Sequence, residues 1–364
     1  MGAFHTIAVA PLHAAVRLVV RGFGSNEAEV ETVATNLVEA NLTGHDSHGV
    51  GMLPRYVEAF KEGGLVANQH VKTVVDAGGL LRLDGLAGFG QVIGGEAIDL
   101  GILRAREHGS CIVALGNSHH LGRIGAWAEQ AAQAGLVSLH FVNVISRTIV
   151  APYGGADARF GTNPFTAGIP LTGREPFILD FATSVLAQGK TRVAFNKGEP
   201  LPPDVLLDDQ GQPTRDPRYG VVPPFGAILA FGQHKGYGLA VLCELLGGAL
   251  AAGMTQRTDD VSQKRILNGM LSVLIDPAVI ADRASFEREA LAFIDWVKAS
   301  PAREGFDPVR IAGEPERETR SKRTTQGVPV DETTWNEILD AAAKVGVDPA
   351  AVNAAAGLRT RRAT

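Results

Sequence analysis

The chain has 364 residues, 45% of them hydrophobic and 20% charged, a composition that is ordinary for a folded protein and too apolar for a disordered one. Because domains usually contain about 100 to 200 residues, this length predicts two or three domains. The 34 basic and 39 acidic residues give a net charge of −5, so the overall field does not favour nucleic acid or anionic lipid. We therefore expect neither a nucleic-acid partner nor a membrane partner.

The cysteines and one long apolar run bear on location. Cys111 and Cys243 lie far apart in apolar runs, so we expect no disulfide framework and no paired-cysteine metal site. The reducing cytoplasm is the default compartment for such a chain. Residues 236–254 are nearly all apolar but carry Glu244 at mid-span, and an acid at the bilayer centre costs about 2.5 to 3.5 kcal/mol. We predict a buried helix there.

Two helices are predicted near the N-terminus. Asn26 is suited to cap a helix that ends near Leu42, and Glu29 follows three residues later, as in a capping box. Apolar residues at helical spacing predict a second helix from Leu53 to the glycines after residue 62. The polar segment 43–49 between them contains two histidines.

From residue 71 onward, strand and helix patterns alternate, which indicates α/β architecture. The predicted strands are 71–76, 80–84, 111–115, 136–142, 177–181 and 270–275. The predicted helices are 91–108, 125–134, 185–195, 236–252, 286–297, 334–345 and 349–355. The mixed-charge stretch 314–323 is predicted to be a solvated linker.

The glycine-rich run from Gly88 to Gly94 is a poor match to a dinucleotide-binding fingerprint. Its third glycine comes one residue late, and the strand before it is weak. Patterns typical of P-loop NTPases, zinc proteases and serine hydrolases do not occur in the sequence. The motif search alone therefore identifies no standard nucleotide or hydrolase site.

Histidines supply a clearer indication of chemistry, because His45 with His48 and His119 with His120 form two polar, glycine-flanked clusters. Imidazole exchanges protons near neutral pH, so either cluster could supply a general acid or base, and Ser47 could orient its neighbour. Two alternatives stay open at this point. The histidines could be structural hydrogen-bonding groups, or His45, His48 and His120 could bind zinc.

A third polar cluster combines residues 160–164 with residues 178–184. A strand end followed by small and hydroxyl residues could present free backbone N–H groups to a phosphate. The alternative is an ordinary capped helix, with Thr183 or Ser184 as the cap.

Six motifs in a fixed order give the sequence a family resemblance. They are Asp46–Val50 with Leu53–Tyr56, Asn117–Gly122, Gly161–Pro164, Leu179–Ser184, His234–Leu239 and Gly313–Pro315. With these motifs the chain resembles the malate/L-lactate dehydrogenase family over about residues 10–350, and this family has the sulfolactate-dehydrogenase-like fold. The resemblance implies interconversion of small-molecule 2-oxo and 2-hydroxy acids with NAD or NADP, and a homodimer.

The same resemblance implies a non-Rossmann nucleotide-binding fold, which would explain the poor fingerprint at Gly88. A helical substrate and dimer domain is expected to combine residues 1–70 with residues 321–364. Residues 71–320 are expected to form the α/β NAD(P)-binding core.

Roles of single residues are carried over by position in the motifs. Ser47 and His48 match a proton-donor pair, while other members of the family place the acid or base at the position of His120. Both assignments stay open, with His48 favoured because Ser47 adjoins it. The implied cofactor-binding residues are His48, Gly122, Arg123, Ile124, Ile178, Leu179, Asp180, Phe181, Ala182, His234, Lys235, Asn268, Gly313, Glu314, Pro315 and Glu316.

The sequence departs from the family pattern at two positions. Many members have a carboxylate-binding arginine where this chain has Met52, so that role is expected to pass to Arg123, or otherwise to Arg55. Cyclic imine (piperideine or pyrroline carboxylate) reductases of the family tend to carry an acid near Lys190, and an ammonium cannot replace it. Imine reduction is thus the alternative activity, followed by a zinc-dependent hydrolase or lyase and a nucleotide-binding protein without catalysis.

Overall fold

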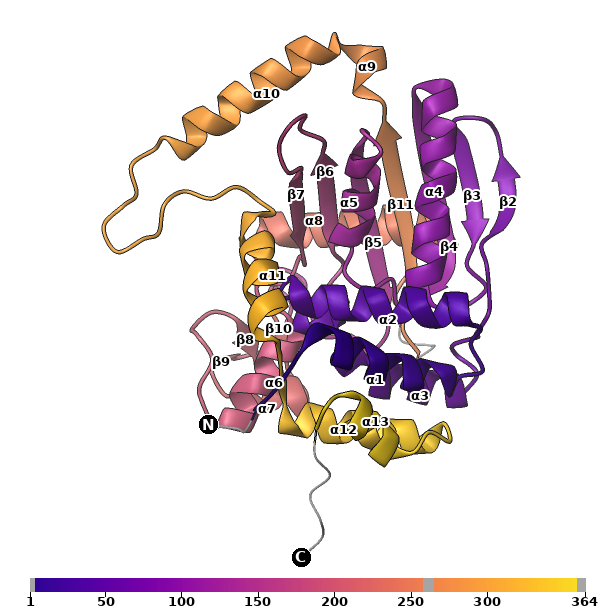
Figure 1. The fold of residues 1–364 in the computed structure, drawn as a ribbon. Helices are drawn as coiled ribbons and strands as arrows, with labels where there is room; N and C mark the ends of the chain where they lie inside the picture. The colour runs from indigo at the N-terminus through magenta and orange to yellow at the C-terminus, as the bar shows by residue number, and fades with distance from the viewer. Residues whose placement is uncertain (1–3, 258–264, 359–364) are drawn as a thin grey trace, which may run out of the picture.

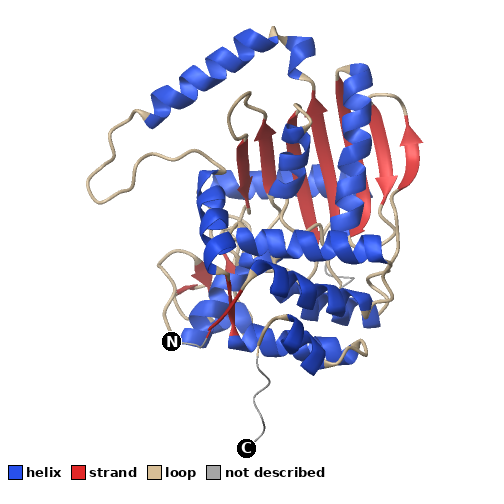
Figure 2. Cartoon of the chain, viewed as in Figure 1, coloured by secondary structure: helices blue, strands red, loops and turns tan. Residues whose placement is uncertain are grey.

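A seven-stranded sheet and a helical layer form the body of the protein, and the helices lie across one end of the strands (Figure 2). The structure is a computed structural model that describes residues 4–257 and 265–358.

The main sheet is mostly antiparallel. In spatial order its strands are β2 (Lys72–Asp76), β3 (Leu80–Asp84), β4 (Ser110–His119), β11 (Leu267–Ile275), β5 (Val137–Ile145), β6 (Phe165–Ile169) and β7 (Phe177–Phe181). Among these neighbours, β3 and β4 run parallel and every other pair runs antiparallel. A Rossmann sheet is mostly parallel, so the predicted α/β class with a non-Rossmann core is confirmed.

Helices cover both faces of this sheet (Figure 1). On one face lie α4 (Gly90–His108) and α5 (Gly125–Gln133), and behind the sheet lie α8 (His234–Cys243) and a π-helical segment, Glu244–Leu250. The strand residues together with those of α4 and α5 form one buried apolar cluster, which includes Ile98, Leu115 and Trp127. This cluster fixes the end of β4, where the second histidine pair begins.

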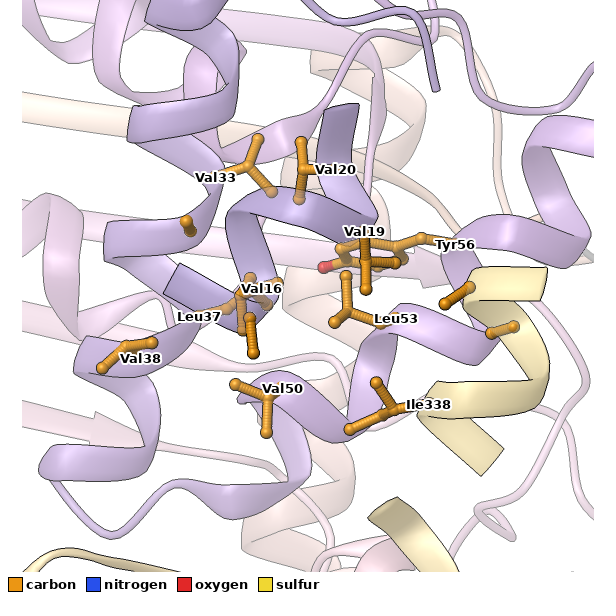
Figure 3. Close-up of a cluster of buried hydrophobic side chains, with 14 of the residues drawn as sticks. Val16, Val19, Val20, Val33, Leu37, Val38, Val50, Leu53, Tyr56 and Ile338 are labelled. Carbon is orange, nitrogen blue, oxygen red and sulfur yellow. The ribbon is translucent and has the colours of Figure 1, made fainter. Parts of the chain in front are cut away.

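Both ends of the chain contribute to the helical layer. Its helices are α1 (Val9–Arg21), α2 (Glu27–Leu42), α3 (Leu53–Lys61), α12 (Glu332–Lys344) and α13 (Pro349–Ala355), and β1 (Phe4–Ile7) pairs with β12 (Val328–Asp331). Figure 3 shows Val16, Leu37 and Leu53 packed with Ile338 from the C-terminal part. A helical part built from both chain ends is therefore confirmed. The boundaries at residues 70 and 321 stay a prediction, and residues 1–3 and 359–364 lie outside the described chain.

Local signals in the sequence predicted α2 and the loop after it well. The backbone N–H of Glu29 donates to Asn26 Oδ1 at 2.9 Å, as a capping residue requires. After α2 the chain makes two short 3₁₀ turns, Asp46–His48 and Val50–Met52, before α3 begins.

The prediction of a linker at 314–323 is wrong, because these residues lie in α11 (Glu314–Gln326). The helix is polar on all sides and is stabilised by ion pairs with the helical layer. Arg320 pairs with Glu39, and Arg323 pairs with Asp46 at 2.6 Å. Dense mixed charge therefore marks a docked helix here and not a solvated segment.

A smaller lobe follows β7. It contains α6 (Gln188–Lys197), α7 (Arg218–Val221) and a three-stranded sheet of β8 (Leu206–Leu207), β9 (Pro213–Thr214) and β10 (Ala227–Ile228). The predicted helix 185–195 begins only at Gln188, after Ala187, so Thr183 and Ser184 do not cap it. Their hydroxyls instead donate to the backbone oxygens of Thr162 and Leu186.

Two apolar surfaces remain uncovered in the single chain. Beyond α9 (Pro277–Ile280), α10 (Arg283–Lys298) stands away from the body, and its Phe293 and Trp296 are 63% and 72% exposed (Figure 1). The helix predicted at 236–252 is present, but its complete burial is wrong, because Leu245 and Leu250 are 54% and 65% exposed. In the described part of the chain no helix is both long and apolar enough to cross a membrane.

Candidate functional site

The site forms where β4 ends against the start of α4. A Cβ atom on Gly90 would lie only 2.1 Å from the backbone oxygen of His120 and 2.6 Å from that of His119. Only a glycine allows α4 to begin this close to the histidine backbone. The glycine-rich run of the poor fingerprint therefore has a packing role.

The two histidine clusters meet in space. The rings of His48 and His120 stack with centroids 5.5 Å apart and planes at 17°. His120 Nδ1 lies 2.7 Å from the hydroxyl oxygen of Tyr56, which belongs to the buried helical core (Figure 3). One imidazole thus comes from the loop after α2 and the other from the strand end.

His48 sits in a turn that is held from two sides. Arg323 and Asn41 Nδ2 both hydrogen-bond to the Asp46 carboxylate, two residues earlier. His48 Nδ1 lies 3.0 Å from the hydroxyl oxygen of Ser47. Burial, helped by the nearby His45, lowers the pKa of His48 to about 4, while the carboxylate of Asp180 acts in the opposite direction.

The second histidine pair is buried, with His119 0% and His120 9% exposed. His119 ends β4, and both of its ring nitrogens are buried without a hydrogen-bond partner in the described chain. Burial and then the Arg55 cation lower the pKa of His119 to about 3. Burial also lowers the pKa of His120 well below its usual range, with smaller effects from His48, His119 and Arg55. Strand β4 continues to His119, four residues beyond the predicted apolar strand at 111–115.

Arg55 is a cation without a matching acid. It precedes Tyr56 on α3, and its guanidinium makes no hydrogen bond or ion pair with the described residues. Burial lowers its pKa, with Glu58 acting in the opposite direction. Because its charge also lowers the pKa values of His119 and His120, the guanidinium acts on the histidine site.

Arg123 lies in a different environment, at the start of α5. Its Nη2 donates to Glu129 at 2.5 Å, whereas its Nη1 is buried without a partner. A Cβ on Gly125 would lie 2.5 Å from this Nη1 and 2.7 Å from Asp180 Oδ2. Asp180 accepts from Gly125 N and from the Thr166 hydroxyl, both at 2.8 Å. The structure thus brings Arg123 and Asp180 together, as two of the predicted cofactor residues.

The start of α11 lies beside the start of β7. Ile178 N donates to the backbone oxygen of Ala312 at 3.4 Å, and Gly313 adopts a φ of +93°, which favours glycine. Glu316 lies 3.5 Å from His45. Ile178, Gly313 and Glu316, with the intervening Glu314 and Pro315, therefore border the same region as the histidine loop.

The remaining predicted residues have mixed positions. Asn268 is buried, accepts from Leu121 N and donates to Asn143 O, both at 2.9 Å, so its amide supports the chain just before Gly122 and Ile124. Phe181 packs against Phe231, with ring centroids 5.3 Å apart, next to Leu179 and Ala182.

His234 and Lys235 are exposed at the start of α8. Met52 packs against the helical core, and Lys190 is exposed on α6.

In residues 4–257 and 265–358, no group of three or more His, Cys, Asp and Glu side chains is arranged to bind a metal ion. The zinc alternative requires His45, His48 and His120 to converge. Instead, His45 faces Glu316, and His120 uses Nδ1 toward Tyr56.

Comparisons with known proteins identify the family. The model of the malate/L-lactate dehydrogenase family matches residues 7–339. The chain belongs to the malate/L-lactate dehydrogenase family. It is 48% identical to hydroxycarboxylate dehydrogenase B of Escherichia coli (strain K12), over 94% of this chain and 95% of that protein. The runs His120–Gly125 and Gly189–Ala194 predicted this particular similarity within the malate/L-lactate dehydrogenase family, and the identity confirms it.

Solved structures support the same assignment. An Escherichia coli structure superposes with a TM-score of 0.93 at 46% identity, covering 97% of this chain and 99% of that one. The sulfolactate dehydrogenase of Methanocaldococcus jannaschii gives 0.84 at 30% identity, covering 95% and 98%. The sulfolactate-dehydrogenase-like fold is thus confirmed, and this member of the malate/L-lactate dehydrogenase family is a dehydrogenase of the 2-hydroxy acid type.

Sequence reasoning missed two side chains of the site. Tyr56 is predicted only as part of a helical stripe and of the first family motif, and Gln91 only as part of the glycine-rich run where a helix begins, so neither side chain is assigned a role. Gln91 Nε2 donates to the Tyr56 hydroxyl at 2.8 Å. No local spacing pattern could indicate these contacts, since Tyr56 and His120 are 64 residues apart.

His140 on β5 provides a test of how burial affects the protonation of a histidine in this protein. It is fully buried, with Nδ1 2.8 Å from the Ser272 hydroxyl and Nε2 3.0 Å from the Ser138 hydroxyl. Burial lowers its pKa to about 4, and Asp180 acts in the opposite direction. Below the ordinary histidine pKa of about 6.5, the unfolded chain binds a proton that the folded protein does not bind, so acidification favours unfolding.

We therefore expect His140 to cost the fold up to about 1.4 kcal/mol per pH unit as the pH falls from about 6.5 toward about 4. His140→Gln should flatten the loss of unfolding free energy over this range, measured by urea denaturation at each pH. His70→Gln is the control with the opposite sign. Glu96 raises the pKa of His70, so protonation of His70 stabilises the folded protein at low pH. A His140→Gln slope equal to that of the wild type would contradict the prediction.

Proposed function

We propose that the chain interconverts 2-oxo acids and 2-hydroxy acids with NAD or NADP, and that His48 is the proton donor and acceptor. The observation that carries the proposal is the stacked pair of His48 and His120, 5.5 Å apart, beside the unpaired guanidinium of Arg55. Family membership supplies the reaction class, and these side chains supply a proton carrier, a second hydrogen-bonding group and a cation for the substrate.

The residues around Arg123 fit a nicotinamide dinucleotide. The buried, unpartnered Nη1 of Arg123 is a donor that an acceptor on the cofactor would satisfy. Exposed Lys235 at the start of α8 offers a cation to phosphate oxygens. Ile178 and Gly313 would border the bound cofactor from β7 and α11. When bound, the reduced nicotinamide supplies the hydride that adds to C2 of the 2-oxo acid.

His48 is favoured over His120 for the proton because of their different partners. The Ser47 hydroxyl beside His48 can rotate to accept as well as donate a hydrogen bond. The Asp180 carboxylate also favours the protonated form of His48. Negative charge develops on the substrate oxygen during reduction, so a proton delivered there lowers the barrier.

Arg55 is proposed to bind the substrate carboxylate in place of the family arginine replaced by Met52. A guanidinium binds a carboxylate through two parallel hydrogen bonds, which orients the oxo acid. Glu129 already occupies one nitrogen of the Arg123 guanidinium, whereas Arg55 makes no hydrogen bond or ion pair with the described side chains and interacts with Glu58 only through its charge. Arg123 is accordingly assigned to the cofactor side.

The reductase alternative lacks its proposed acid. Lys190 is exposed on α6 beside Gly189, where a Cβ would lie 3.3 Å from the Ser47 Cβ. An ammonium at this place cannot complete a serine, histidine and carboxylate relay. The chain therefore favours oxo acids over cyclic imines.

A homodimer would cover the two exposed apolar surfaces. Phe293 and Trp296 on α10 are more than half exposed and lie with ring centroids 6.1 Å apart, and Leu245 and Leu250 are exposed behind the sheet. Exposed aromatic and aliphatic groups of this kind mark protein interfaces. We propose a second copy of the chain as the partner.

The first test is direct. Purified protein, given a 2-oxo acid such as phenylpyruvate or hydroxypyruvate, is expected to oxidise NADH or NADPH in the presence of a chelator, followed by the absorbance of the reduced nicotinamide. Activity that is lost on chelation and restored by zinc alone would overturn the proposal in favour of the metalloenzyme.

The His48→Asn variant tests the proton donor. General acid catalysis typically contributes about 10² to 10⁴ in rate, so kcat should fall by that order at saturating substrate and cofactor. His13→Asn is the matched control and should keep the wild-type kcat, because the His13 ring contacts Thr35 and Glu31 of α2. A His48→Asn variant with near wild-type kcat would exclude His48 as the donor.

A pair of arginine variants tests the carboxylate site. Arg55→Lys should lower kcat/KM for 2-oxo acids by at least about tenfold, or about 1.4 kcal/mol, and leave the affinity for NAD(P)H unchanged. Arg123→Lys should instead weaken NAD(P)H binding, measured by fluorescence titration. The reverse pattern would place the substrate carboxylate at Arg123.

A further inference from the structure

Three buried side chains form a hydrogen-bonded chain that ends at His120. Gln91 Nε2 donates to the Tyr56 hydroxyl oxygen at 2.8 Å, and this oxygen lies 2.7 Å from His120 Nδ1. Tyr56 is fully buried, Gln91 is 1% exposed and His120 is 9% exposed. Water therefore cannot replace any member of the chain from the core side.

The direction of the hydrogens follows from counting donors and acceptors. Because Gln91 donates to the Tyr56 oxygen, the hydroxyl hydrogen of Tyr56 is free to point at His120 Nδ1. If His120 Nδ1 carried its own hydrogen, the Tyr56 hydroxyl hydrogen would have no acceptor. A buried donor without an acceptor is costly, so Nδ1 is the acceptor and the hydrogen of the neutral imidazole is on Nε2.

His120 Nε2 is the atom that faces the open part of the site. It makes no hydrogen bond to the described residues, yet it is not among the buried atoms without partners, whereas both nitrogens of His119 are. His48 is stacked on the same ring. A hydrogen on Nε2 is thus available to a ligand bound beside His48.

We propose that Tyr56, held by Gln91, is a positioning residue that keeps His120 in its Nε2–H tautomer, so that Nε2–H donates a hydrogen bond to the oxygen at C2 of the substrate. This inference rests on the proposed 2-oxo acid reaction. The two histidines then have different roles. His48 transfers the proton, and His120 polarises the carbonyl group of the substrate.

The surrounding charges agree with a neutral His120. Burial is the main cause, and the positive charge of Arg55 on α3 further disfavours a charge on the ring, as would a proton on His48 or His119. A neutral imidazole that donates from Nε2 stabilises the developing negative charge on the oxygen without losing its proton. His48 has no comparable constraint, because the Ser47 hydroxyl rotates freely.

Nitrogen NMR of the wild-type protein tests the tautomer directly. With ¹⁵N-labelled histidine, the His120 ring is expected to show the Nε2–H pattern near pH 7.5, with His120→Gln assigning the signals. In Tyr56→Phe, Nδ1 loses its donor and the ring should become a mixture of both tautomers. An Nδ1–H pattern in the wild type, or an unchanged Nε2–H pattern in Tyr56→Phe, would overturn the proposal.

Kinetics then test the consequence. Tyr56→Phe should lower kcat for 2-oxo acid reduction by about tenfold, with unchanged affinity for NAD(P)H. Gln91→Met, which leaves the tyrosine hydroxyl in place, should cause a smaller loss. Tyr219→Phe, in the small lobe, should have no effect. A Tyr56→Phe enzyme with normal thermal unfolding and wild-type kcat would contradict the role.

The NMR and kinetic experiments together distinguish a failure of this proposal from a failure of the proposed function on which it rests. If the wild type reduces no 2-oxo acid, the proposed function fails, and the ¹⁵N spectra alone decide the tautomer. If the wild type reduces 2-oxo acids but its spectra show Nδ1–H, the reaction stands and the role of Tyr56 is rejected.

Discussion

The burial of Tyr56 is the constraint on which the site depends. Its ring lies in the helical core beside Val19 and Leu53, where close packing leaves it one position (Figure 3). Its hydroxyl reaches His120, which directly follows strand β4 of the main sheet. This hydrogen bond thus links the helical layer to the end of the sheet at the candidate site. The stacking of His48 on His120, the approach of Arg55 and the direction of Nε2 all follow from where this ring is held.

The site contains more unsatisfied polar groups than a core would tolerate. His119 has two buried ring nitrogens without partners, and Arg123 Nη1 and Gln91 Oε1 are also unpartnered among the described atoms. Each unmade hydrogen bond of this kind costs about 1 to 3 kcal/mol. The packed layers around the site hold these groups in place, and an anionic, hydrogen-bonding ligand would recover part of this energy on binding.

The sequence predicts those parts of the structure that local patterns determine. Asn26 caps α2 as expected, and the central strands and helices follow their apolar periodicity. Spacing alone could not show that His48 and His120 share one site, although the zinc alternative and the family resemblance each placed them together. The docked helix at 314–326 was mistaken for a linker because its partners, Glu39 and Asp46, are distant in sequence. Tyr56 looked like any core residue, since tertiary contacts alone give its hydroxyl a role.

The pairing of β1 with β12 has a consequence for biosynthesis. The N-terminal helices leave the ribosome first, but α12 and α13, which complete their core, are made last. Until then the nascent chain carries an uncovered apolar face, the kind of surface that chaperones bind and that aggregates at high concentration. The candidate site also forms late, because Arg323 of α11 hydrogen-bonds to Asp46 in the turn that holds His48. The turn before His48 can therefore reach its final arrangement only after α11 has been synthesised.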